Sequence, residues 1–149
     1  MTVEQLQFDT HRHNGIDGSR AIKQASYVSV YLPGAMPATA TNYGVFFIAQ
    51  RNCIVKDFYE VHGVAGTNAG AVTLQLERLQ GTETLDGGDA LLQTAVNLKG
   101  TASTVTRGLL VDNYDVSLKA GDRLALKDAG TLTDVAGLCV TVTIEYEYI

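Results

Sequence analysis

The sequence has little of several residue types, and each scarcity excludes a class of protein. Its 149 residues include no Trp, two Pro, two Cys and only 18% Asp, Glu, Lys and Arg, where about 25% is usual. Hydrophobic residues reach 46%, which is too many for a disordered chain. No apolar run approaches the roughly 18 residues of a membrane-spanning helix. The composition therefore indicates a folded, sparsely charged protein without a helical membrane span.

Length and charge narrow the class further. A chain of this length is most simply one domain that buries about two thirds of its unfolded surface, so it needs no disulfide or metal to fold. The formal net charge of −5 argues against a nucleic-acid partner, which requires a clustered basic face. Residues 1–6 have neither the basic stretch nor the apolar core of a signal peptide. We therefore expect no secretion, and no disulfide between Cys53 and Cys139.

The residues that are abundant are those of β-sheets and turns. Thr occurs 16 times and Gly 15 times; Thr and Val favour pleated, half-buried surfaces, and Gly supplies turns. Helix signals are weak, because only residues 89–96 fit a short helix, and their apolar residues fit a strand equally well. The composition thus predicts an all-β fold.

Alternation of apolar and polar residues locates the strands. The run 138–148 alternates for eleven residues, with Leu138, Val140, Val142 and Ile144 on one face. Other strands are predicted at 27–32, 43–49, 53–61 and 72–77, and a turn followed by a strand at 116–126. Pro33-Gly34 is expected to end the first of these strands. The nearly continuous apolar run at 43–49 is expected to be covered on both faces.

Seven to nine strands separated by Gly turns, with no helices between them, predict an antiparallel β-sandwich with jelly-roll or Greek-key connections. Residues 1–25 are polar and rich in turn signals, so we expect an extended N-terminal arm before a sandwich domain at 26–149. Ala65-Gly66-Thr67 in the Gly-rich stretch 63–70 is repeated as Ala129-Gly130-Thr131 in the stretch 129–137, which suggests two loops at the same end of the sandwich. The stretch 63–70 is not followed by the Gly-Lys-Ser/Thr of a phosphate-binding loop.

The arm contains one distinctive pattern, His11-x-His13-x-Gly15-x-Asp17-Gly18-Ser19. A cupin metal site uses His-x-His within a strand followed by Glu, and an amidohydrolase needs a barrel of about 250 residues, so neither fits. The histidines can belong to a solvated, tightly turned arm. Alternatively, His11 and His13 lie about 7 Å apart on an extended chain, and three chains on a threefold axis offer six nitrogens for a transition-metal ion. Apart from that ion, we expect no cofactor.

Other polar residues give no enzyme signature. Glu83, Asp86 and Asp89 are close in sequence, as catalytic carboxylates must be close in space, but a Gly-rich loop makes turn residues the better interpretation. No nucleophile elbow, zinc motif or base beside either Cys is present. His62 follows a predicted strand and is expected to be a surface or hydrogen-bonded residue. We therefore expect no catalytic residues.

Sparse charge also favours an assembly. The apolar run at 45–49 and the last strand need more cover than one small sandwich provides, and exposed apolar patches mark interfaces. Seven Tyr residues supply the amphipathic rings that interfaces use, although they also fit the rim of a sandwich. These observations predict a homo-oligomer.

Two resemblances extend this interpretation. The stretch from Leu118 to Leu126, with its Gly121-Asp122 turn, resembles the penultimate hairpin of trimeric jelly rolls of the TNF and C1q type, and implies a homotrimer. The pattern from His11 to Ser19 resembles the N-terminal segment of many tailed-bacteriophage virion proteins, including fibre, spike and capsid-decoration proteins. Some trimeric phage fibres hold iron with such histidine pairs.

The second resemblance implies a capsid-docking arm with a defined set of contact residues: Phe8, His11, His13, Asn14 and Asp17. It makes His11 and His13 arm anchors or axial metal ligands. The sequence has no repeats or heptads, so a shaft is not expected. It implies a non-enzymatic decoration (cement) protein on the outer surface of the virion, bound to the major capsid protein or another virion protein. The alternatives are a tail-fibre tip, adaptor or receptor-binding protein and, third, a glycan-binding module.

Overall fold

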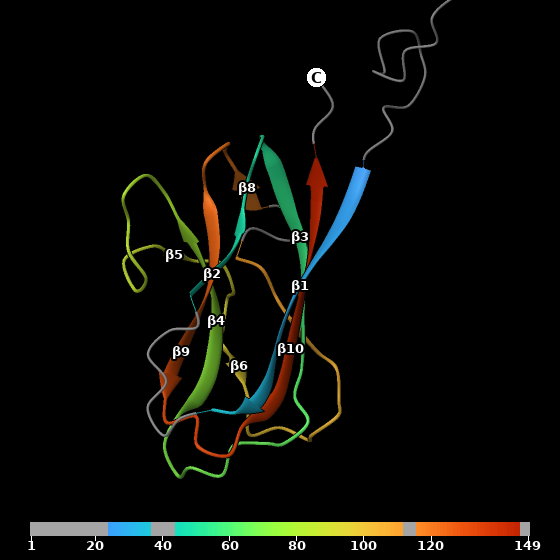
Figure 1. The fold of residues 1–149 in the computed structure, drawn as a ribbon, viewed down its shortest axis with the longest axis vertical. Helices are drawn as coiled ribbons and strands as arrows, with labels where there is room; N and C mark the ends of the chain where they lie inside the picture. Colours follow the sequence, from blue (N-terminus) through green and yellow to red (C-terminus); the bar gives the residue numbers. More distant parts are fainter. Residues whose placement is uncertain (1–23, 37–43, 112–115, 147–149) are drawn as a thin grey trace, which may run out of the picture.

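A computed structural model describes residues 24–36, 44–111 and 116–146, and it places two β-sheets face to face (Figure 1). Sheet A contains β1 (Gln24–Ala35), β10 (Ala136–Tyr146), β3 (Cys53–Val61), β7 (Thr106–Gly108) and β8 (Val116–Leu118). Sheet B contains β2 (Gly44–Ile48), β9 (Arg123–Gly130), β4 (Val72–Leu79), β5 (Asp89–Ala90) and β6 (Val96–Asn97). Every pairing is antiparallel. Among the described residues there is no helix, and so none that could span a membrane.

The strand order is that of a jelly roll. Sheet A runs β1-β10-β3-β7, with β8 also on β3, and sheet B runs β2-β9-β4-β5, with β6 also on β4. With the short pieces β5 and β6 taken as one interrupted strand, and β7 and β8 as another, the eight strands form two four-stranded sheets. The all-β jelly-roll prediction is confirmed.

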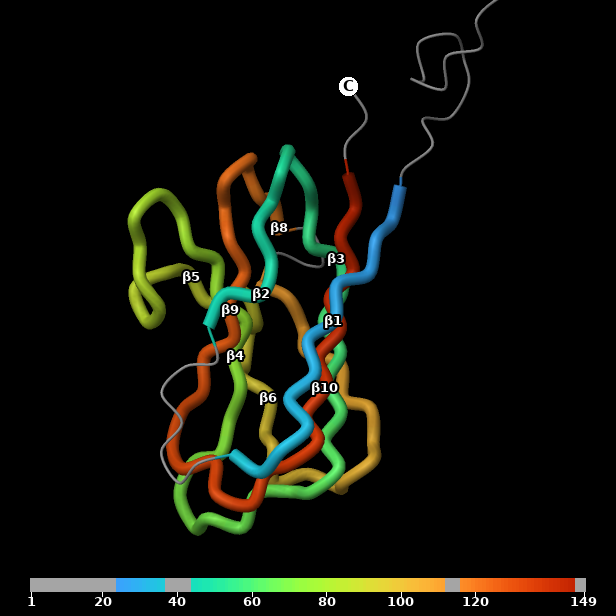
Figure 2. The backbone as a smooth tube through the Cα atoms, viewed as in Figure 1, coloured from blue at the N-terminus to red at the C-terminus, as the bar shows by residue number. Residues whose placement is uncertain are grey.

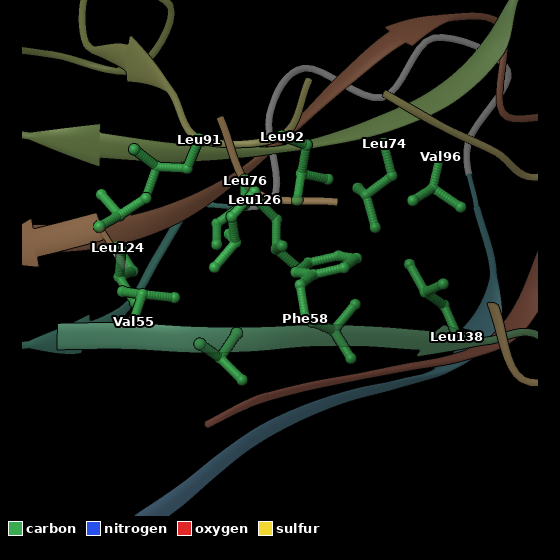
Figure 3. Close-up of a cluster of buried hydrophobic side chains, with 14 of the residues drawn as sticks. Val55, Phe58, Leu74, Leu76, Leu91, Leu92, Val96, Leu124, Leu126 and Leu138 are labelled. Atoms are coloured by element: carbon green, nitrogen blue, oxygen red, sulfur yellow. The ribbon is translucent and has the colours of Figure 1, made fainter. Parts of the chain in front are cut away.

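The core lies between the sheets. Figure 3 shows Phe58 of β3 reaching from sheet A toward Leu74 and Leu76 of sheet B, and all three are fully buried. The alternation in the last strand is confirmed, because Leu138, Val140, Val142 and Ile144 are buried while their neighbours in sequence are half-exposed. Each such buried side chain contributes roughly 1.5–3 kcal/mol. The two inner faces therefore supply the main stabilisation of the fold.

Two predictions about the edge strands were wrong. Strand β1 does not end at Pro33-Gly34 but continues to Ala35, with a register shift after Leu32. Proline is tolerated there because β1 is an edge strand and its outward N–H groups have no strand to pair with. The run at 43–49 is not covered on both faces either. Strand β2 is the edge of sheet B, and its Ile48 is 60% exposed.

The turn before β9 also differs from expectation. Residues 116–126 do not form a hairpin, because β8 pairs with β3 in sheet A while β9 lies in sheet B. The turn between them crosses from one sheet to the other at Gly121, whose φ of +93° favours glycine. Asp122 closes this turn by accepting a hydrogen bond from the Lys119 N–H, at 2.9 Å. Residues 89–96 form β5 and the start of β6, and no helix.

Two further predictions are confirmed. Cys53 pairs across the sheet with Tyr146 and Cys139 with Val61, so the two thiols lie toward opposite ends of β10 and form no disulfide. The Gly-rich loops meet at one end, seen at the bottom of Figure 2, where the Thr67 hydroxyl donates to the Asp134 carboxylate. We call this the loop end. Residues 1–23, which include most of the predicted arm, lie outside the described part of the chain.

Candidate assembly interface

The predicted arm contacts Phe8, His11, His13, Asn14 and Asp17 all lie outside the described residues. The acidic residues of the 80–89 loop are described, and each is engaged in a structural contact. Asp86 pairs with Lys127, Asp89 pairs with Arg78 at 2.6 Å, and Glu83 accepts from the Gln80 N–H at 2.7 Å. The hydrogen bond to Asp86 raises the pKa of Lys127. These residues act as turn residues, as predicted.

Glu77 holds the 80–89 loop in place through hydrogen bonds to its backbone. Its carboxylate is buried and accepts the N–H groups of Asp86 and Gly88, at 2.9 and 3.2 Å. A Cβ on Gly88 would lie 2.2 Å from the Arg78 carbonyl oxygen, so only glycine fits there. The loop is thus held against the outer face of sheet B. Within the described part of the chain, no group of three or more His, Cys, Asp or Glu is placed to hold a metal ion.

The outer face of sheet A carries a tyrosine face, which we define as Tyr27, Tyr31 and Tyr59 with Ser29 and Thr141. The three rings are 74%, 61% and 36% exposed. Ser29, Thr141 and Tyr59 lie in one cross-strand row, and the Ser29 and Thr141 hydroxyls are 2.8 Å apart. Exposed tyrosines with few charges around them are typical of protein interfaces. Three of the seven tyrosines thus fit the predicted assembly role.

The tyrosine face has a charged border at β7. Arg107 of β7 lies over the Tyr59 ring at 5.9 Å and pairs with Asp57. The Arg107 charge is therefore partly balanced, and the face remains close to neutral where it meets β7. Tyr43, Tyr114 and Tyr148, which also supported the interface prediction, lie outside the described residues.

A second surface lies where β2 of sheet B faces the β1–β10 part of sheet A; we call this the open side. It holds a hollow of about 520 Å³, the β2 groove, lined by Val45, Phe46, Phe47, Ile48, Gln50 and Tyr146. Phe46 is the bulged residue of β2, since Val45 pairs with Ala125 and Phe47 with the adjacent Leu124. The bulge explains why the apolar run at 45–48 presents side chains in more than one direction.

Residues 91–97 and 106–111 meet on the other side of the sandwich, the closed side. Leu92 and Leu110 form a β-bridge, and the Gln93 N–H and side-chain amide donate to the carbonyls of Leu109 and Leu110, at 2.8 and 2.9 Å. The Val111 N–H donates to the Leu91 carbonyl at 2.9 Å. Hydrogen bonds therefore join the two sheets directly on this side.

A buried ionisable pair, Glu60 and His62, anchors the loop that leads into the closed side. The His62 Nδ1 and Glu60 Oε1 atoms are 2.6 Å apart, both side chains are about 1% exposed, and Nε2 lies 3.3 Å from the Gly100 carbonyl oxygen. The Ser103 N–H also donates to the His62 carbonyl, at 2.7 Å. Burial raises the pKa of Glu60, and the hydrogen bond from His62 opposes this rise.

His62 was predicted to be a surface or hydrogen-bonded residue; it is hydrogen-bonded, and it is buried. The sequence contained a signal for this. Phe58, Glu60 and His62 follow period-two alternation, so the inward direction of Phe58 places both polar side chains inward as well. Glu60 Oε2 is buried and has no hydrogen-bond partner among the described residues.

Comparison with known proteins gives similarity in fold only. No family model matches the sequence, and no curated protein matches it. A chain in a structure of the cyanophage Pam1 capsid asymmetric unit is similar at 16% identity and a TM-score of 0.55, covering 83% of this chain and 84% of that one. A chain in a structure of the Ralstonia phage GP4 capsid is similar at 17% identity and a TM-score of 0.55, and the similarity covers 84% of this chain and 83% of that one. This protein therefore has a fold similar to that of chains found in two phage capsid structures.

Proposed function

We propose that this protein is a non-enzymatic structural protein of a tailed-bacteriophage virion, and specifically a decoration (cement) protein. In this proposal it sits as a homotrimer on the outer surface of the capsid and bridges neighbouring capsomers. Its partner is the major capsid protein or another virion protein.

One observation carries the proposal: the fold is similar over more than four fifths of both chains to chains in two phage capsid structures. The covered shares are nearly equal, so those chains are about as long as this one. A component of a capsid asymmetric unit is repeated over the whole shell, as a cement protein is. The carboxylates of the 80–89 loop are engaged in structural contacts, which favours a structural role over catalysis.

The mechanism follows from repetition. In the proposal the arm docks on the shell through Phe8, His11, His13, Asn14 and Asp17, while the sandwich contacts its neighbours. Each contact contributes a modest affinity, and several contacts held together multiply it, because the second binding event is intramolecular. The net charge of −5 favours a position outside the shell, away from packaged nucleic acid.

The tyrosine face provides the uncharged surface that a homotrimer needs. In a trimer with its arms near the threefold axis, His11 and His13 of three chains would supply six nitrogens to a transition-metal ion. Metal analysis of the purified oligomer tests this part alone. A bound metal that is lost in a His11→Ala/His13→Ala variant supports it, and a metal content equal to that of this variant contradicts it.

The decisive experiment adds purified protein to shells stripped of their accessory proteins and counts the copies bound. A cement protein saturates the shell with many copies and raises the temperature at which the shell breaks. Binding of a few copies at a single vertex would instead favour a tail protein, and no binding to shells or tails would contradict a virion role.

A receptor-binding tail tip or adaptor is the second candidate, and the loop end favours it. There the Thr67–Asp134 contact brings two Gly-rich loops together, as in many binding sites built from loops. A glycan-binding module is the third candidate, supported by the exposed rings of the tyrosine face. Specific binding of a glycan by the isolated protein, lost on Tyr27→Ala, would move that candidate to the first place.

A further inference from the structure

The β2 groove is lined entirely by uncharged residues. Strand β2 has the sequence Gly-Val-Phe-Phe-Ile, without a Lys, Asp, Glu or Pro. Natural edge strands are normally protected by such residues, because an unprotected edge pairs with other chains. The bulge at Phe46 is the one protective device in β2. Val45 and Ile48 nevertheless remain substantially exposed, which indicates that another segment covers this edge.

The place where the arm joins the sandwich identifies that segment. Gln24, the first residue of β1, pairs with Tyr146, and Tyr146 lines the β2 groove. Gln24 and Tyr146 also line a neighbouring hollow of about 420 Å³ together with Gln50 and Arg51, whose guanidinium lies over the Tyr146 ring at 4.4 Å. Residues 1–23 therefore join the domain at the rim of the groove.

The sequence of the arm suits this position. Leu6 and Phe8 are two apolar residues on either side of an uncharged Gln7; in an extended chain both point the same way, about 7 Å apart. Asn14-Gly15 and Asp17-Gly18 are strong turn formers between Phe8 and Gln24. Residues 9–23 can span up to about 50 Å when extended. The chain is thus long enough to leave Gln24, reverse direction and return.

We propose that the arm folds back on its own sandwich, with Leu6 and Phe8 seated in the β2 groove beside Ile48. Closure within one chain occurs at high effective concentration, so it needs no partner. Residues 11–17 are then a loop held at both ends, with its histidines exposed at the end of the sandwich where β1 begins. A loop held in this way loses less conformational entropy on docking than a free arm does.

This inference concerns the chain by itself and goes beyond the proposed function. It changes the role of Phe8 from a shell contact to an internal anchor, and leaves His11, His13, Asn14 and Asp17 as the docking residues. Its failure would not affect shell binding through His11, His13, Asn14 and Asp17, and failure of shell binding would not affect the folded-back arm. The two can therefore be tested separately.

The absence of Trp provides the test. A Phe8→Trp substitution in the full-length protein introduces a single Trp, whose emission is excited without exciting tyrosine. We expect emission at short wavelength and quenching by iodide several-fold weaker than for free Trp. Adding Ile48→Asp to this chain is expected to shift the emission to the wavelength of exposed Trp and restore quenching. Adding Val105→Asp, at a residue that is 65% exposed away from the groove, is expected to change neither.

A mixing experiment distinguishes one chain from two. The Phe8→Trp chain is refolded with a large excess of Ile48→Asp chains that retain Phe8, and its emission is expected to stay at short wavelength. A shift to long wavelength would show that the arm enters the groove of another copy, which overturns the proposal. Exposed emission in the starting Phe8→Trp chain, or short-wavelength emission that survives Ile48→Asp, overturns it as well. Thermal melts of each variant exclude unfolding as the cause of a shift.

Discussion

Where residues 91–97 meet residues 106–111, hydrogen bonds join the two sheets, whereas on the open side the sheets enclose the apolar β2 groove. The closed side is held together by these hydrogen bonds between the sheets, although its Leu109 and Val111 side chains are 46% and 41% exposed. The open side leaves Val45 and Ile48 substantially exposed. This contrast indicates that one side of the sandwich stabilises the fold while the other is available for a further segment or subunit.

The largest effect is expected from removing the pair that anchors the closed side. His62→Ala leaves the Glu60 carboxylate buried without its hydrogen bond to His62. Breaking one partner of a buried pair costs about 3–5 kcal/mol, so urea unfolding should show a loss of that size. In the double variant Glu60→Gln/His62→Ala part of the loss should be recovered. A loss below about 1 kcal/mol for His62→Ala would show that the pair does not anchor this side.

A pair of truncations compares the two sides directly. Leu110→Ala removes a buried side chain at the Leu92–Leu110 bridge and should lower the free energy of unfolding by about 2–5 kcal/mol. Ile48→Ala on the open side should change it by no more than about 0.5 kcal/mol in the monomeric chain. Equal losses at the two positions would remove the distinction between the sides.

The Glu60–His62 pair should also give the closed side a pH dependence. Because burial raises the pKa of Glu60 above its usual value of 4.5, the folded state holds this proton more tightly than the unfolded chain. The resulting stabilisation is complete below that value and is lost as the pH rises through the raised pKa. Each tenfold change in the dissociation constant corresponds to about 1.4 kcal/mol.

Glu60→Gln removes this titration and keeps an acceptor for the His62 N–H. The stability of the variant relative to the wild type should therefore increase with pH from about 4.5 upward, as measured by urea unfolding across that range. A difference that is constant with pH would mean that Glu60 does not titrate there.

A smaller effect is expected at Gln93, whose side-chain amide donates to the Leu110 carbonyl. Gln93→Ala removes one hydrogen bond between the sheets, which is worth about 1 kcal/mol. The Val111 N–H donates the neighbouring hydrogen bond, to the Leu91 carbonyl. The free energy of opening measured by hydrogen exchange at this N–H should fall by a similar amount. Unchanged exchange there would show that the bonds of the closed side act independently.

The smallest change in stability, and the clearest change in behaviour, is expected for Tyr27→Lys. Tyr27 is 74% exposed on the edge strand β1, and a charge there opposes contact with other chains, so the variant should self-associate less at high concentration while its free energy of unfolding stays within about 0.5 kcal/mol of the wild type. Mass photometry and urea unfolding measure the two quantities. Self-association equal to that of the wild type would assign the interface to another surface, such as the open side.

Much of the fold followed from alternation, because a buried strand face leaves a period of two in the sequence. The run from Leu138 to Ile144 was predicted correctly for this reason. Strand β2 was predicted to be covered on both faces, but it is an edge strand. A continuous apolar run occurs both in central strands and in edge strands that bind another segment, so the sequence does not distinguish them. Pro33 was wrongly predicted to end its strand. The free-energy cost of a proline in a strand depends on whether the strand lies at an edge, and that is a property of the whole sheet.

The candidate surfaces were less accessible to prediction. The tyrosine face depends on Tyr59 of β3 lying in the same row as Ser29 of β1, and that register is fixed by β10 between them. No local pattern contains this information. The turn at Gly121-Asp122 suggested a hairpin because its local geometry does not reveal that the next strand belongs to the other sheet.

The pairing of Gln24 with Tyr146 also determines how the domain would transmit mechanical force. Tension applied between Gln24 and Tyr146 would separate two neighbouring antiparallel strands from one end and break their hydrogen bonds one after another, at low force. Tension that enters at Gln24 and leaves through the loop end would act along the strands, so that the hydrogen bonds between β1 and β10 share the load. A domain pulled at Gln24 and held at its loop end would therefore resist far more force than the same domain pulled between Gln24 and Tyr146.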